Sequence, residues 1–169
     1  QFYRQHNDWQ SYLKTLLLKA EQCEDLLQKS NALYRVSMTF ADQFYDYENA
    51  AHYMLDAIKY DNENPDLWLA LAQFYLAKEE TLNAIEALKH AELYQDNLSK
   101  LPTLTRLTQL HIELKMLSEA LRYFSEAADL NPPLESLAPF ILELQTLSLQ
   151  RQELGSYAQI WEKLHPRDR

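Results

Sequence analysis

The chain has 169 residues, a formal net charge of −9 and a single cysteine. A chain of this length can bury a hydrophobic core without disulfide bonds, and one cysteine excludes both an internal disulfide and a multi-cysteine zinc site. Most of the negative charge lies before Lys100, which argues against a nucleic acid or an anionic membrane as the main partner, because those surfaces are bound through clustered Lys and Arg.

Composition also restricts the fold class. One glycine and six prolines leave few residues for the tight turns of hairpins and barrels, so we predict an all-α protein. No apolar run reaches the ~18 residues of a membrane span, and the start lacks the pattern of a signal peptide. Because the chain begins with Gln1, we expect a processed product or a piece of something longer. We favour the cytoplasm and leave open a processed periplasmic or membrane-associated form.

The first predicted element is a helix over residues 7–29, whose apolar residues recur on one helix face. Cys23 lies on that face, which favours a small buried thiol over a nucleophile. We assign residues 1–30 to this helix, either as the second helix of an earlier repeat or as a lone helix that covers the first full repeat. The apolar face comprises Trp9, Tyr12, Leu13, Leu16, Ala20, Cys23 and Leu27.

The middle of the chain is repetitive. Shifting residues 65–98 by 34 positions toward the N-terminus, or by 36 toward the C-terminus, aligns alanine with alanine. Such a period predicts stacked helix pairs, because two short helices cannot bury their apolar faces alone and small residues leave room for a neighbour. We therefore define repeat units over residues 31–64, 65–98 and 101–134. The aligned alanines are Ala50, Ala84 and Ala120 in one set and Ala57, Ala91 and Ala127 in the other.

The second unit resembles the tetratricopeptide repeat, a helix–turn–helix unit of about 34 residues with the signature W-x2-L-G-x2-Y followed by A-x3-F. Its matching residues are Trp68, Leu71, Ala72, Tyr75, Ala84, Leu88 and Ala91. The first unit aligns through Tyr34, Ser37, Met38, Ala41, Ala50, Met54 and Ala57, and the third through Leu104, Leu107, Ala120, Phe124, Ala127 and Pro132. The resemblance implies an α-solenoid of stacked helix-turn-helix repeats that forms a right-handed superhelix. In that fold the first helices line a concave groove and the second helices cover the outside.

Turn and cap residues predict where helices begin. Thr81 and Ser118 are the expected N-caps of the second helices in two units, and Asn64 or Asp66 is expected to cap the helix after residues 61–66.

Residues 135–169 continue the helix–turn–helix pattern with a poorer match to the repeat signature. We predict that they form a degenerate C-terminal helical pair that caps the stack. Pro139 is tolerated only in a first turn, which predicts a helix start near Ala138. Gly155 is expected at the turn between the two helices, and Trp161 occupies the place of a repeat alanine.

No assembled catalytic or cofactor site is evident. A single glycine excludes Rossmann and P-loop nucleotide sites, and the histidines are dispersed, so we expect ordinary surface histidines, His111 included, and neither a metal nor a cofactor. The acidic run at residues 61–66 lacks the glycine of a calcium loop and is predicted to be a turn. The aromatic residues Phe40, Phe44, Tyr45, Tyr47 and Tyr53 are predicted to pack between helices.

What remains is a surface, and we predict a non-enzymatic scaffold or adaptor whose concave groove binds another protein as an extended peptide or a helix. One alternative is a chaperone of the type III secretion translocator class; another is a repeat domain that presents substrate within a larger enzyme or assembly factor. Self-association through the terminal helices is a further expectation. The groove residues are predicted to be Arg35, Thr39, Asp42, Gln43, Leu69, Gln73, Leu76, Arg106, Gln109 and Glu113.

Overall fold

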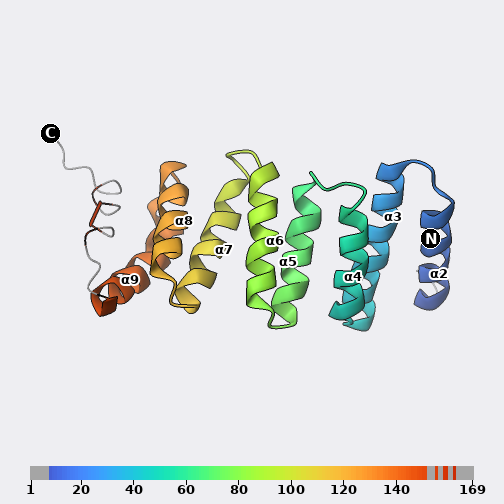
Figure 1. The fold of residues 1–169 in the computed structure, drawn as a ribbon, viewed down its shortest axis with the longest axis horizontal. Coiled ribbons are helices and arrows are strands. Elements are labelled where there is room, and N and C mark those ends of the chain that lie inside the picture. The colour runs from blue at the N-terminus through green and yellow to red at the C-terminus, as the bar shows by residue number, and fades with distance from the viewer. Residues whose placement is uncertain (1–7, 152–154, 156–157, 160–161, 163–169) are drawn as a thin grey trace. The chain divides into compact units, whose positions relative to one another are not determined.

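The computed structural model describes residues 8–151 together with residues 155, 158, 159 and 162, and every regular element among them is helical (Figure 1). The all-α fold class is confirmed. The helices are α2 (Trp9–Gln22), α3 (Leu26–Thr39), α4 (Tyr47–Ile58), α5 (Pro65–Ala77), α6 (Thr81–Tyr94), α7 (Lys100–Glu113), α8 (Leu117–Asp129) and α9 (Leu134–Arg151), with a π-helix, η1 (Phe40–Phe44), directly after α3. They belong to two compact units, Gln1–Tyr94 and Gln95–Arg169. No helix of the described part is long and apolar enough to cross a membrane.

In the first unit, α3 packs on α4 and α5 packs on α6, and α4 also contacts α5 (Figure 1). The repeat alanines Ala50 and Ala57 are completely buried in α4. Their small side chains let the two backbones approach closely, and serine hydroxyls of α3 reach across the contact. Ser37 donates to the carbonyl of Ala50 at 2.6 Å, and Ser30 donates to the carbonyl of Ala57 at 2.9 Å. Alanine therefore recurs at these positions because the helices touch there.

In the second unit, α7 packs on α8, and both contact α9. Ala120, Phe124 and Ala127 are buried on one face of α8, with at most 1% exposure. His111 is also buried, at 2% exposure, so the prediction of a surface histidine is wrong at this position. Its Nδ1 lies 2.7 Å from the carbonyl oxygen one turn earlier, and its ring lies 5.1 Å from that of Tyr123, which accounts for a polar residue in the core.

The turns inside the three helix pairs repeat at the level of the backbone. Tyr45, Glu79 and Lys115 have positive φ angles of 55°, 61° and 57°, and they are separated by the same two offsets as the sequence repeat. A left-handed residue commonly ends a helix. After Glu79 and Lys115, the next amide donates at 2.8 Å to the carbonyl five residues earlier, which belongs to Tyr75 in one unit and His111 in the other.

The π-helix η1 inserts one extra residue into the first unit. There the amide of Asp46 donates at 3.1 Å to the carbonyl of Phe40, six residues earlier, because a π-helical turn is wider than an α-helical one. Phe40 is therefore the structural equivalent of Tyr75 and His111. The predicted alignment of the first helix is wrong by one residue before η1. Its signature positions are Leu33, Val36, Ser37 and Phe40, in place of Tyr34, Ser37, Met38 and Ala41.

A turn at residues 23–25 divides the helix that was predicted over residues 7–29. The helix α2 ends at Gln22, and Asp25 caps α3 by accepting a hydrogen bond from the amide of Leu27 at 2.9 Å. Aspartate is a favourable N-cap, so a new helix begins although the apolar spacing continues. Cys23 consequently lies half-buried at the end of α2 and is not the fully buried thiol that the sequence predicts.

The predicted caps have mixed outcomes. Asn64 caps α5 by accepting from the amide of Asp66 at 3.1 Å, which confirms that prediction. Thr81 and Ser118 are not caps, because α6 begins at Thr81 itself and the residue before α8 is Met116. In each of these turns the cap position falls directly after the left-handed residue, one or two residues earlier than predicted.

The C-terminal helix begins earlier than predicted. The helix α9 starts at Leu134, so the predicted start near Ala138 is wrong, and Pro139 lies inside the helix. Proline has no amide hydrogen, so one backbone hydrogen bond of α9 is missing. Its acceptor would be a carbonyl in the first turn, so the missing bond lies near the N-terminal end of the helix. Gly155 has helical conformation, so the prediction of a turn there is also wrong. Trp161 lies outside the described residues.

The aromatic cluster mostly packs between helices. The rings of Phe40 and Tyr53 stack with centroids 5.4 Å apart, which joins η1 to α4. Tyr47 and Phe74 lie 6.4 Å apart and join α4 to α5. Two residues are exceptions: Tyr45 is 75% exposed at its left-handed turn, and Phe44 is 41% exposed with its ring 5.9 Å from that of Phe40 in the same π-helix. The packing prediction is therefore wrong for Tyr45 and Phe44.

Lys78 joins the turns of the first two repeat units. Its ammonium forms ion pairs with Glu48 at the start of α4 and with Glu80 at 2.9 Å, and the lysine side chain is 20% exposed. Hydrogen bonds to Glu48 and then Glu80 raise the pKa of Lys78, and the hydrogen bond from Lys78 lowers the pKa of Glu80. Both shifts favour the charged forms in the folded state.

We expect Lys78→Met to lower the free energy of unfolding by about 1 kcal/mol at neutral pH, in the upper range for partly exposed ion pairs. Because the pKa of Lys78 is raised in the folded state, its ion pairs stabilise the fold fully at pH values below the unfolded pKa of 10.5. Because the pKa of Glu80 is lowered in the folded state, its ion pair stabilises the fold at pH values above the unfolded pKa of 4.5. That stabilisation is lost as the pH falls through the folded pKa of Glu80. Urea unfolding curves should therefore show a smaller difference between wild type and variant below about pH 4.5 than at pH 7. An unchanged difference in acid would contradict the ionic origin.

Candidate binding site

A pocket of the first unit lies where α2 meets the end of α3 and the π-helix η1. It gathers four of the predicted groove residues, together with three aromatic side chains and a methionine. Its lining residues are Trp9, Tyr12, Tyr34, Arg35, Met38, Thr39, Asp42 and Gln43.

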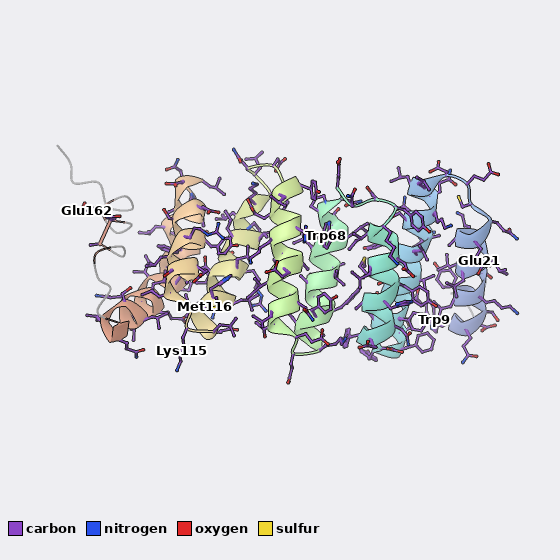
Figure 2. All side chains as sticks on the ribbon, viewed as in Figure 1. Trp9, Glu21, Trp68, Lys115, Met116 and Glu162 are labelled. Carbon is purple, nitrogen blue, oxygen red and sulfur yellow. The ribbon has the colours of Figure 1, made fainter. Side chains whose placement is uncertain are left out.

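The helix α2 supplies one wall of the pocket. A turn of three residues joins α2 to α3, and the two helices pack side by side, so the first turn of α2 faces the last turns of α3 and η1. Asp8 starts α2 by accepting from the amide of Ser11 at 3.1 Å, which places Trp9 at the pocket end of the helix. Figure 2 labels Trp9 at the end of α2 that lies away from the α2–α3 turn. Its ring packs edge-on against Tyr12 with centroids 6.0 Å apart.

Two charged residues of the pocket have no partner among the described residues. Arg35 and Asp42 are exposed, and neither forms an ion pair or a side-chain hydrogen bond within that part of the chain. On a helix, charges pair with residues three or four positions away. For Arg35 these positions hold Asn31, Ala32, Met38 and Thr39, and for Asp42 they hold Met38, Thr39, Tyr45 and Asp46, so neither has an opposite charge at a helical pairing position.

Thr39 contributes less than the groove prediction implies. Its side chain is buried at 7% exposure, and its hydroxyl donates to the carbonyl of Arg35 at 2.7 Å. That hydroxyl proton is therefore already used within the helix. Thr39 forms part of the pocket wall.

The size of the pocket restricts what it can hold. Its volume is about 100 Å³, equivalent to roughly three water molecules at about 30 Å³ each. Small-molecule sites usually span roughly 300–1,000 Å³. The pocket therefore matches one side chain of a partner better than a cofactor.

The remaining predicted groove residues lie on two other helices. Leu69, Gln73 and Leu76 share one face of α5 and do not line this pocket. The other three, Arg106, Gln109 and Glu113, lie on α7 in the second unit, where Gln109 donates to Glu113 at 3.1 Å. A continuous groove over both units stays a prediction.

Sequence reasoning missed four residues of the pocket. Tyr34 and Met38 were missed because the alignment ignored the extra residue of η1; in the corrected register they are the equivalents of Leu69 and Gln73. A comparison of Leu33-x2-Val36-Ser37 with the repeat signature would have found that register. Trp9 and Tyr12 were missed because their role depends on how α2 packs, which no repeat offset encodes.

Metal chemistry has no assembled donor set in the described part of the chain. No group of three or more His, Cys, Asp or Glu side chains there is placed to hold a metal ion. The first part of the acidic run, residues 61–64, lies in the turn between α4 and α5, where Asn64 donates to Asp61 at 2.8 Å, and Pro65 and Asp66 begin α5.

Comparison with known proteins gives a structural likeness and no sequence family. No protein-family model matches the chain, and no curated protein matches it. A crystal structure of MamA superposes with a TM-score of 0.66 at 13% identity, over 95% of this chain and 91% of that chain. The fold is a helical-repeat solenoid. A second crystal structure, of MamA protein, gives a TM-score of 0.65 at 15% identity, over 95% of this chain and 85% of that one. At these identities the likeness to MamA concerns the fold alone.

Proposed function

We propose that the protein is a non-catalytic interaction module that binds a peptide segment of a partner protein, with one partner side chain seated in the pocket between α2 and α3. The observation that carries the proposal is a pocket of single-side-chain size with aromatic walls and two charges that have no partner in the described part of the chain. Such a site resembles the pockets that give side-chain specificity in peptide recognition.

The architecture supports this function. Helical-repeat proteins use extended surfaces formed by successive helices to bind their partners. The structural likeness to MamA supports the same class of fold. Leu69, Gln73 and Leu76 on α5 give the peptide a further candidate surface, with two half-buried leucines and an exposed amide.

Selection of short random peptides on phage tests the proposal. We expect wild-type protein to enrich peptides whose affinity falls at least tenfold in Tyr34→Ala, because that change removes a wall of the pocket. Fluorescence anisotropy with synthetic versions of the selected peptides measures the loss.

Tyr94→Ala is the matched control, since Tyr94 is 40% exposed at the end of α6 in the same unit and lies outside the pocket. Thermal melts of both variants check that the fold is retained. Equal affinity of every selected peptide for wild type and Tyr34→Ala would refute the proposed site.

A further inference from the structure

We propose that the pocket selects a dipolar, extended peptide: one apolar side chain seated in the pocket, flanked by an acidic side chain that pairs with the exposed Arg35 and a basic side chain that pairs with the exposed Asp42. This inference rests on the proposed function and names the chemistry of the partner.

The Arg35 end of the pocket favours an acidic group. Arg35 is exposed, lines the pocket and has no carboxylate partner among the described residues. An arginine guanidinium offers several donors in a fixed plane and binds carboxylates through paired hydrogen bonds. A glutamate or aspartate of the partner can therefore pair with it without displacing an existing ion pair.

The Asp42 end favours a basic group. The carboxylate of Asp42 is exposed and unpaired within the described part of the chain, and η1 places it in the pocket. Trp9 also lines the pocket. Tryptophan is the ring that best attracts a cation to its face. A lysine or arginine of the partner can therefore pair with the carboxylate of Asp42 in a pocket that also offers an indole ring.

The pocket lining favours an apolar side chain. Met38 lies between Arg35 and Asp42 in the chain, Tyr12 and Tyr34 also line the pocket, and all three are half-buried and offer hydrophobic surface to an occupant. Methionine adapts its shape to different neighbours, and tyrosine combines an apolar ring with a polar tip.

The spacing of the two charges sets the spacing in the peptide. Arg35 and Asp42 are seven positions apart, which corresponds to at most about 10 Å along the helix axis, the value for an α-helix at about 1.5 Å per residue, because the wider turn of η1 begins at Phe40. An extended chain advances about 3.3 Å per residue, so three residues span that distance. The acidic and basic residues of the partner should therefore be separated by three positions.

A peptide of one charge sign fits less well. A wholly acidic segment would meet the carboxylate of Asp42, and a wholly basic segment would meet the guanidinium of Arg35. Complementary charges at both ends select orientation as well as sequence, because reversing the peptide places like charges together.

A charge swap tests the inference. The variant Arg35→Asp, Asp42→Arg exchanges the two signs, and its matched control, Lys14→Asp, Glu21→Arg, makes the same exchange seven positions apart on exposed residues of α2 (Glu21 is labelled in Figure 2). Random peptides on phage are selected separately on wild type and on the pocket variant. We expect wild type to enrich acid and base three positions apart in one order, and the pocket variant to enrich the opposite order.

Synthetic wild-type peptides should bind the pocket variant at least tenfold more weakly and bind the control variant as they bind wild type. Peptides that depend on Tyr34 but show no order of charges would overturn this inference and leave the proposed function standing. If no selected peptide depends on Tyr34, or if none is enriched, both proposals are overturned.

Discussion

Phe124→Ala is expected to lower the free energy of unfolding by about 3–5 kcal/mol, the usual range for truncating a fully buried phenylalanine. Phe124 is only 1% exposed on α8 and lies on the face that carries Ala120 and Ala127. Alanine would remove the ring and leave a cavity that the packed helices cannot fill by small movements. Urea unfolding followed by circular dichroism measures the effect.

Leu142→Ala is the control for Phe124→Ala in the same unit. Leu142 is 69% exposed on α9, so its truncation removes little buried surface, and we expect a change within about 0.5 kcal/mol. Comparable losses for the two variants would show that Phe124 does not lie in a well-packed core.

Ala50→Leu is expected to lower the free energy of unfolding by about 3 kcal/mol, the upper part of the range for overpacking a core. Ala50 has no exposed surface, and its carbonyl accepts the hydroxyl of Ser37 at 2.6 Å. Three additional carbon atoms have no space unless α3 and α4 separate, and their separation would break that hydrogen bond. The same unfolding measurement checks the loss.

Ala77→Leu makes the same chemical change on the exposed last residue of α5. We expect it to be close to neutral, because the added side chain extends into solvent. If Ala50→Leu were equally neutral, the contact between α3 and α4 would be looser than the structure indicates.

The repeat could be predicted because each alanine marks a helix contact. The alanines of α4, α6 and α8 are buried where a larger side chain would force helices apart, so the constraint is written into the sequence at a fixed offset. The left-handed turns at Tyr45, Glu79 and Lys115 have the same offsets, although their residue types differ. The three units therefore share the spacing of their buried alanines, whereas the residue type at the left-handed turn position differs between them.

The errors in prediction arise where local chemistry or a distant contact overrides the pattern. The alanines that set the repeat offset lie after η1 and do not reveal its extra residue, which rotates every preceding residue of α3. Asp25 ends a run that looks like one helix, because its carboxylate can cap a new helix. The contribution of Trp9 to the pocket depends on the packing of α2 on α3, which is a tertiary contact.

The nitrogen–proton NMR signals of the tryptophan indoles test the central claim most directly. Trp9 lines the pocket, whereas Trp68 lies outside it and donates its indole hydrogen to the carbonyl of Asn62 at 2.8 Å (both are labelled in Figure 2). Titration of a peptide selected by wild type should shift the indole signal of Trp9, assigned with Trp9→Phe, and leave that of Trp68 in place. Saturating peptide with an unmoved Trp9 signal would contradict the account.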